Sequence, residues 1–157
     1  MIAQRLRTHV NRLVVQDERL AHVRPDAEVW SALEYVCHMR DVVSFYEERI
    51  VLVCSEHRPQ LSTMDFGKLA DDRRYQDDDL DAALAAVEIG ARSTVEFLVA
   101  LGETDWQRAG VGSGGGDRTV LVLARRLAHE GHHQVLDLDR GRDTLLDGER
   151  PALDGLG

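Results

Sequence analysis

The chain has 157 residues and a formal net charge of −9, and 30% of its residues are charged. This length fits one domain with one core, and the composition is neither that of a disordered chain nor that of a fibrous one. The acidic balance argues against nucleic acid and an anionic membrane surface as partners, because both attract clustered basic side chains. No apolar run reaches the ~18 residues of a membrane-spanning helix, and the N-terminus lacks the apolar core of a signal peptide. We expect a cytoplasmic protein without membrane or nucleic-acid partners.

Two cysteines, Cys37 and Cys54, fall within one predicted helix. The helical rise places them about 25 Å apart, whereas a disulfide requires Cα atoms within roughly 7 Å. They cannot pair with each other, and no disulfide framework is implied.

Apolar side chains at helical spacing predict two helices in the first part of the chain, over residues 2–21 and 28–55. Pro25 interrupts the pattern between them, and Asp26 is the predicted N-cap of the second helix. The apolar stripe of the first helix comprises Ile2, Leu6, Val10, Leu13 and Leu20, and that of the second comprises Trp30, Leu33, Val36, Cys37, Val43, Ile50 and Val53. Each helix is expected to bury this face in a core.

Residues 56–76 form a connection with little periodicity, interrupted by Pro59 and Gly67. Its larger apolar side chains are Met64, Phe66, Leu69 and Tyr75. We expect this segment to pack over the other helices as a strap and not to hang free as a linker.

Two further helices are predicted over residues 80–101 and 120–139. The acidic run at 77–79 suits the positive end of the first helix dipole, and its spacing matches no calcium loop. The glycine-rich segment 110–116 lacks the lysine of a phosphate loop and follows no predicted strand, so a flexible connection is expected. Thr119 is the predicted N-cap of the last helix.

Four amphipathic helices and no convincing strand predict an all-α four-helix bundle. The long connection between the second and third helices favours a crossover over a simple up-and-down order. We assign the bundle to residues 1–140 and a polar tail, expected to be partly disordered, to residues 141–157.

The last helix carries the sequence His-Glu-Gly-His-His, in which His129 and His133 are four residues apart. Their rings lie one turn apart on one face of a helix and can converge on a divalent cation. His132 is rotated by about 100° from His129, so it cannot easily share that site.

The same residues match the H-E-x-x-H signature of zinc proteases, in which Glu130 would be the general base and Glu149 a third ligand. The absence of a predicted sheet to bind an extended peptide argues against this alternative.

A third ligand is better sought in the second helix, at His38. Glu34 lies four residues before it and Asp41 three residues after it, so both carboxylates flank the imidazole on its own face. Carboxylates so placed would fix the tautomer and orientation of a ligating ring. The alternative is that they are surface acids paired with Arg40 or with solvent.

Three segments together resemble the DinB-like superfamily, a group of metal-binding four-helix bundles of the DinB/YfiT type. The segments are WSALEYVCHMRDV in the second helix, DWQR followed by a glycine-rich stretch and TV, and LAHEGHHQVLDL in the fourth helix. Their order and spacing cover about residues 10–140.

The resemblance implies three metal-ligating histidines, which fall on His38, His129 and His133. It further implies a divalent metal, zinc or nickel, with open positions for water or substrate, and it supports a homodimer. Some members of the family resemble thiol S-transferases that use bacillithiol, mycothiol or glutathione, and others have no known activity.

We therefore expect a metal-dependent enzyme of the thiol S-transferase type, in which a thiolate held at the metal attacks a small electrophilic substrate. Arg126, one turn before His129, could contact an anionic substrate or could be an ordinary surface arginine. A non-catalytic metal-binding bundle that acts in stress response is the alternative, and an H-E-x-x-H metallohydrolase is a further one.

Overall fold

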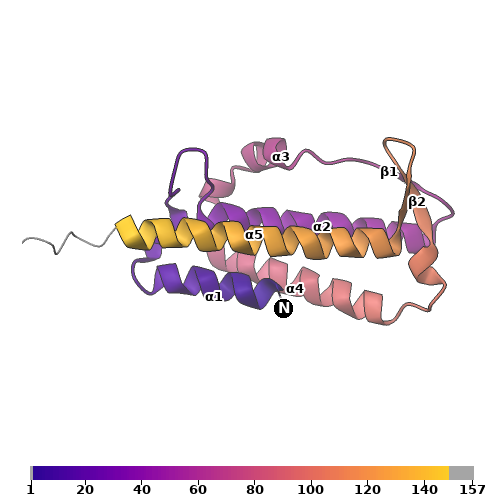
Figure 1. The fold of residues 1–157 in the computed structure, drawn as a ribbon, viewed down its shortest axis with the longest axis horizontal. Helices are drawn as coiled ribbons and strands as arrows, with labels where there is room; N and C mark the ends of the chain where they lie inside the picture. The colour runs from indigo at the N-terminus through magenta and orange to yellow at the C-terminus, as the bar shows by residue number, and fades with distance from the viewer. Residues whose placement is uncertain (1, 149–157) are drawn as a thin grey trace, which may run out of the picture.

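The computed structural model describes residues 2–148, and this part of the chain forms a bundle of long helices (Figure 1). The long helices are α1 (Ile2–Val14), α2 (Ala32–Ser55), α4 (Leu80–Val99) and α5 (Val120–Gly148). Helix α2 packs against both α4 and α5, and α1 also contacts both of those helices. The predicted all-α four-helix bundle is confirmed.

The connection between α2 and α4 returns along the whole length of the bundle, so that these two helices run in the same direction (Figure 1). It contains β1 (Gln60–Leu61), α3 (Phe66–Arg73) and the short 3-10 helix η2 (Tyr75–Asp77). Tyr75 is fully buried and Phe66 packs against the core, whereas Met64 stays exposed. The predicted crossover and strap are therefore observed.

Helix α2 begins at Ala32, four residues later than predicted. The reason is a capping box: the Ser31 hydroxyl accepts a hydrogen bond from the Glu34 amide, and the Glu34 carboxylate accepts one from the Ser31 amide at 2.9 Å. Asp26, the predicted cap, instead accepts a bond from the amide of Glu28 within the preceding turn.

Helix α1 ends at Val14 and not at residue 21 as predicted. Asp17 starts the 3-10 helix η1 (Glu18–His22) by accepting a hydrogen bond from the Arg19 amide. Leu20 and Ala21 are nevertheless buried, which explains why the apolar pattern continued past the end of the helix.

Helix α5 continues to Gly148, beyond the predicted end at Asp139, so the segment assigned to a polar tail begins as helix. Gly141 does not end the helix, and a Cβ at this position would lie 3.1 Å from the Pro25 ring. The glycine thus allows the loop before α2 to approach α5 closely. Residues 149–157 of the predicted tail lie outside the described residues.

The glycine-rich segment is a β-hairpin and not the flexible connection that was predicted. Within the described residues, β2 (Ala109–Gly112) and β3 (Asp117–Thr119) pair antiparallel, and β1 adds to β2 in parallel to complete a three-stranded sheet. Gly115 closes the turn with a φ of +82°, and a Cβ at Gly110 would lie 2.8 Å from Leu61. Strands this short carry no alternating pattern, so periodicity could not predict them.

The core is a single cluster between the four long helices. Its largest fully buried aliphatic side chains include Leu6, Leu13, Leu33, Met39, Ile50 and Leu138. In the part of the chain that the structure describes, no helix combines the length and apolarity needed to cross a membrane.

Candidate metal centre and adjoining pocket

His38 lies on α2 beneath the strap and is only 6% exposed. Its ring packs between Trp30 and Phe66, with centroid distances of 5.2 and 5.1 Å. Burial lowers the pKa of His38 to about 4, although the Asp41 carboxylate opposes this shift, so the ring is neutral at neutral pH. Within the described structure its Nδ1 atom is buried without a hydrogen-bond partner. A neutral imidazole with a free ring nitrogen is the form that binds a metal ion.

The two carboxylates expected to orient His38 bind other groups. Glu34 accepts from the Ser31 amide in the capping box and forms an ion pair with Arg24. The prediction that both carboxylates accept hydrogen bonds from His38 is therefore wrong. Helical spacing put them on the right side of α2, but donors on other segments compete for them.

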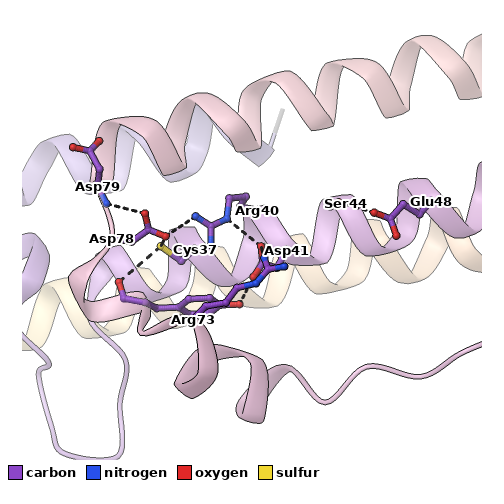
Figure 2. Close-up of polar contacts among 9 residues, drawn as sticks. Cys37, Arg40, Asp41, Ser44, Glu48, Arg73, Asp78 and Asp79 are labelled. Carbon is purple, nitrogen blue, oxygen red and sulfur yellow. Dashed lines mark hydrogen bonds and ion pairs between the residues drawn. The ribbon is translucent and has the colours of Figure 1, made fainter.

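The buried Asp41 carboxylate is the centre of a polar cluster between α2 and the strap (Figure 2). It accepts hydrogen bonds from the Tyr75 hydroxyl at 2.5 Å, from Arg73 Nη1 at 2.6 Å and from Arg40 Nε at 3.0 Å. Arg40 also donates to Asp78 at 2.6 Å. These contacts bind the strap and the start of α4 to α2, so the cluster is structural. The alternative of surface acids that pair with Arg40 is thus half right: Asp41 pairs with Arg40, but Asp41 is buried.

Cys37 belongs to the same cluster and is not a candidate nucleophile. Its Sγ lies 3.6 Å from the Asp78 carboxylate, and burial raises the pKa of the thiol to about 12 (Figure 2). A thiol that stays protonated at neutral pH attacks electrophiles slowly. Cys37 and Cys54 are both free, as predicted.

His129 and His133 form a pair on the surface of α5. Their ring centroids are 4.5 Å apart with the rings edge to face, and both side chains are exposed. Among the described residues, no three His, Cys, Asp or Glu side chains are close enough to hold a metal ion. The structure thus brings two of the three predicted ligands together and leaves His38 apart from them.

His38 and His133 nevertheless lie at similar heights in the bundle. On α2, Tyr35 lies within electrostatic range of Asp137, and Tyr46 lies within range of Glu130. These two pairs align α2 with α5 on either side of His38. Residues 130 and 137 also bracket His133 along α5, so His38 and His133 lie on neighbouring stretches of the two helices.

A pocket of about 240 Å³ adjoins the surroundings of His38 through Phe66 and lies between α2, the strap, the hairpin and α5. Its wall contains Phe66, whose ring also contacts His38, and Arg126, one turn before His129 on α5. Two further arginines, Arg49 and Arg118, line it.

Of these three arginines, only Arg126 was predicted from the sequence. The sequence did contain an indication of Arg49, because a charged residue there interrupts the apolar face of α2 next to Ile50. In the structure this side chain is only 8% exposed. The sequence contained no such indication of Arg118, since its position depends on the unpredicted hairpin. Glu149, the third ligand in the protease alternative, lies outside the described residues.

Comparison with known proteins identifies the fold. The structure of YfiT from Bacillus subtilis, described as a probable metal-dependent hydrolase with an unusual four-helix bundle topology, matches with a TM-score of 0.73 and 16% sequence identity. The match covers 92% of this chain and 85% of that chain. No curated protein sequence matches significantly. The family model of the DinB superfamily matches residues 2–135, and the chain therefore belongs to this superfamily.

Proposed function

We propose that the protein binds one divalent metal ion through His38, His129 and His133 and uses it in a thiol S-transferase reaction. The observation that carries the metal site is the buried, neutral His38 ring, whose Nδ1 has no partner in the described structure. A buried polar atom without a partner is costly, and a metal bond would offset that cost. Three neutral imidazoles are ligands that both zinc and nickel accept.

The three residue types suit such an ion, and binding requires the surface pair to turn toward α2. The rings of His129 and His133 are exposed, so they can change rotamer without disturbing the core. Trp30 and Phe66 enclose His38 and keep bulk water away from it. A zinc or nickel ion, when bound, lowers the pKa of a coordinated thiol or water toward neutrality.

The choice of thiol chemistry rests on the family resemblance and on the absence of a protein nucleophile beside the described site. Since Cys37 is buried and protonated, the nucleophile would be an external low-molecular-weight thiol. A metal-dependent hydrolase is the second candidate, because YfiT, which shares the fold, is described as one. In that case Glu130, between the two surface histidines, is available as a base.

Metal content provides the direct test of the ligands. The wild type and the variants His38→Ala, His129→Ala, His133→Ala and His132→Ala are purified without a chelating tag and analysed by elemental mass spectrometry. We expect one equivalent of metal in the wild type and in His132→Ala, and sharply reduced metal in the other three, because two imidazoles and water form a much poorer site.

Unchanged metal in all three ligand variants would refute the assignment. Loss in His129→Ala and His133→Ala but not in His38→Ala would favour the H-E-x-x-H alternative, with Glu149 as the next residue to change. Conjugation of glutathione, bacillithiol or mycothiol to a chromogenic electrophile then tests the transferase, and cleavage of a nitrophenyl ester tests the hydrolase. A metal-loaded protein that does neither supports the non-catalytic alternative.

A further inference from the structure

We infer that the pocket lined by Arg49, Arg118 and Arg126 binds the anionic group of a small, partly apolar substrate. This inference deepens the proposed function by naming the class of substrate. It depends on the metal site only for where the reaction would occur, because the pocket itself is built from other residues.

The charge of the pocket lining is unbalanced. The lining contains three arginines and neither aspartate nor glutamate, although the whole chain carries a net charge of −9. Among the ion pairs of the described residues, none includes Arg49, Arg118 or Arg126. Two acids are adjacent to these arginines in sequence: Asp117 is paired with Arg58 at 2.7 Å, and Glu48, whose charge acts on Arg49, is exposed and does not line the pocket. Glu130 on α5 raises the pKa of Tyr46 through its charge, but it does not line the pocket.

Arg49 is the best-positioned of the three guanidinium groups. It is 8% exposed and donates to the Ser62 carbonyl at 2.7 Å and to the Phe45 carbonyl at 2.9 Å. It also lies over the Phe45 ring, 3.2 Å from the centroid. These hydrogen-bond partners are neutral and orient the guanidinium, and the Glu48 carboxylate, which also acts on its charge, is exposed to solvent. Buried arginines are rarely left without an anion.

Arg118 and Arg126 reach the same pocket from the hairpin and from α5. Gly116 in the hairpin has no side chain, and this leaves room for Arg118. A Cβ at Gly116 would lie only 3.0 Å from the Nη1 atom of Arg118. Arg126 is exposed and lies beside the Tyr46 hydroxyl, whose pKa is raised by burial and by Glu130 but lowered by this guanidinium. Three guanidinium groups around one space are suited to bind a carboxylate or phosphate in a bidentate manner.

The remaining lining determines the rest of the ligand. Phe45, Phe66, Met64 and Leu123 supply apolar surface, so the anionic group must be attached to an apolar body. Phe66 stacks edge to face on both Phe45 and His38, at 5.2 and 5.1 Å. The apolar body would therefore extend from the arginines toward His38.

The test measures binding of benzoate and phenyl phosphate by calorimetry, with neutral benzamide as the reference compound. The full chain is used both as purified and after removal of metal with a chelator. We expect at least one of the two anions to bind in both preparations and benzamide to bind far more weakly. The stronger of the two anions identifies the carboxylate or the phosphate as the preferred group.

Three variants locate the site. Arg126→Gln and Arg118→Gln should each weaken anion binding by about tenfold or more, because each removes a charged hydrogen-bond donor. Arg125→Gln is the matched control: it removes the same charge from α5 at a position that does not line the pocket. Arg49 is left intact, since it fixes the strap through Ser62.

The inference is overturned if neither anion binds, if benzamide binds equally well, or if Arg125→Gln weakens binding as much as Arg126→Gln. Binding that disappears on removal of metal also overturns it, because the anion would then sit on the metal, as the proposed function allows. Conversely, pocket binding that survives in His133→Ala supports the inference even if the metal ligands are assigned wrongly.

Discussion

Protonation of His38 should destabilise the protein between neutral pH and pH 4. Burial lowers the pKa of His38 from 6.5 to about 4 in the folded protein. The unfolded chain therefore binds a proton in this range that the native state does not bind. Stability from this group is fully present above pH 6.5 and is lost as the pH falls toward 4.

The magnitude follows from the two pKa values. Each unit of difference corresponds to about 1.4 kcal/mol, so the lost free energy of unfolding reaches about 2 kcal/mol at pH 5 and about 3 kcal/mol at pH 4. This is a large share of the ~5–15 kcal/mol that holds a typical domain folded. A bound metal would resist the protonation, so the experiment requires chelator-treated protein.

The assay is urea unfolding, followed by circular dichroism, at several pH values for the wild type and His38→Gln. Glutamine has no titrating ring, so the difference between the two proteins isolates His38 from other groups. His9 is such a group, because burial lowers its pKa as well, and it is present in both proteins. We expect the wild type to lose about 2 kcal/mol more than the variant between pH 7.5 and pH 5. Parallel profiles in this range would refute the reasoning.

Two substitutions, each with a control variant, and one measurement of mass test the rest of the fold. Asp41→Asn should lower the free energy of unfolding by about 2–4 kcal/mol, because it leaves the buried Tyr75 hydroxyl and the Arg73 guanidinium with a weaker acceptor. Glu48→Gln, at an exposed position of the same helix, should change it by less than about 0.5 kcal/mol. Gly110→Ala should lower the melting temperature, since its Cβ would lie 2.8 Å from the neighbouring strand, whereas Gly114→Ala has open space. An equal effect of the two alanines would contradict the hairpin packing. Exposed apolar side chains on α4 are consistent with the predicted homodimer, which sedimentation at micromolar concentration would check; a strictly monomeric species would contradict it.

Local spacing along the chain was sufficient to predict the long helices and the His129–His133 pair. An i,i+4 relation is a property of the helix itself, so these two rings meet wherever the helix packs. The N-cap of α5 was predicted correctly for the same reason: the Thr119 hydroxyl accepts from the amide of Val122, three residues away, at 3.2 Å. The start of α2 carried an equally local signal in Ser31 and Glu34.

Contacts between distant segments decided the rest. Asp41 has the spacing of a partner for His38, but Tyr75 and Arg73 approach from the strap and take its oxygens. The arginine-lined pocket likewise gathers side chains from α2, the hairpin and α5. Periodicity reports only which face of an element is buried. Which donor reaches a buried acceptor depends on how the elements pack, and that is a property of the tertiary structure alone.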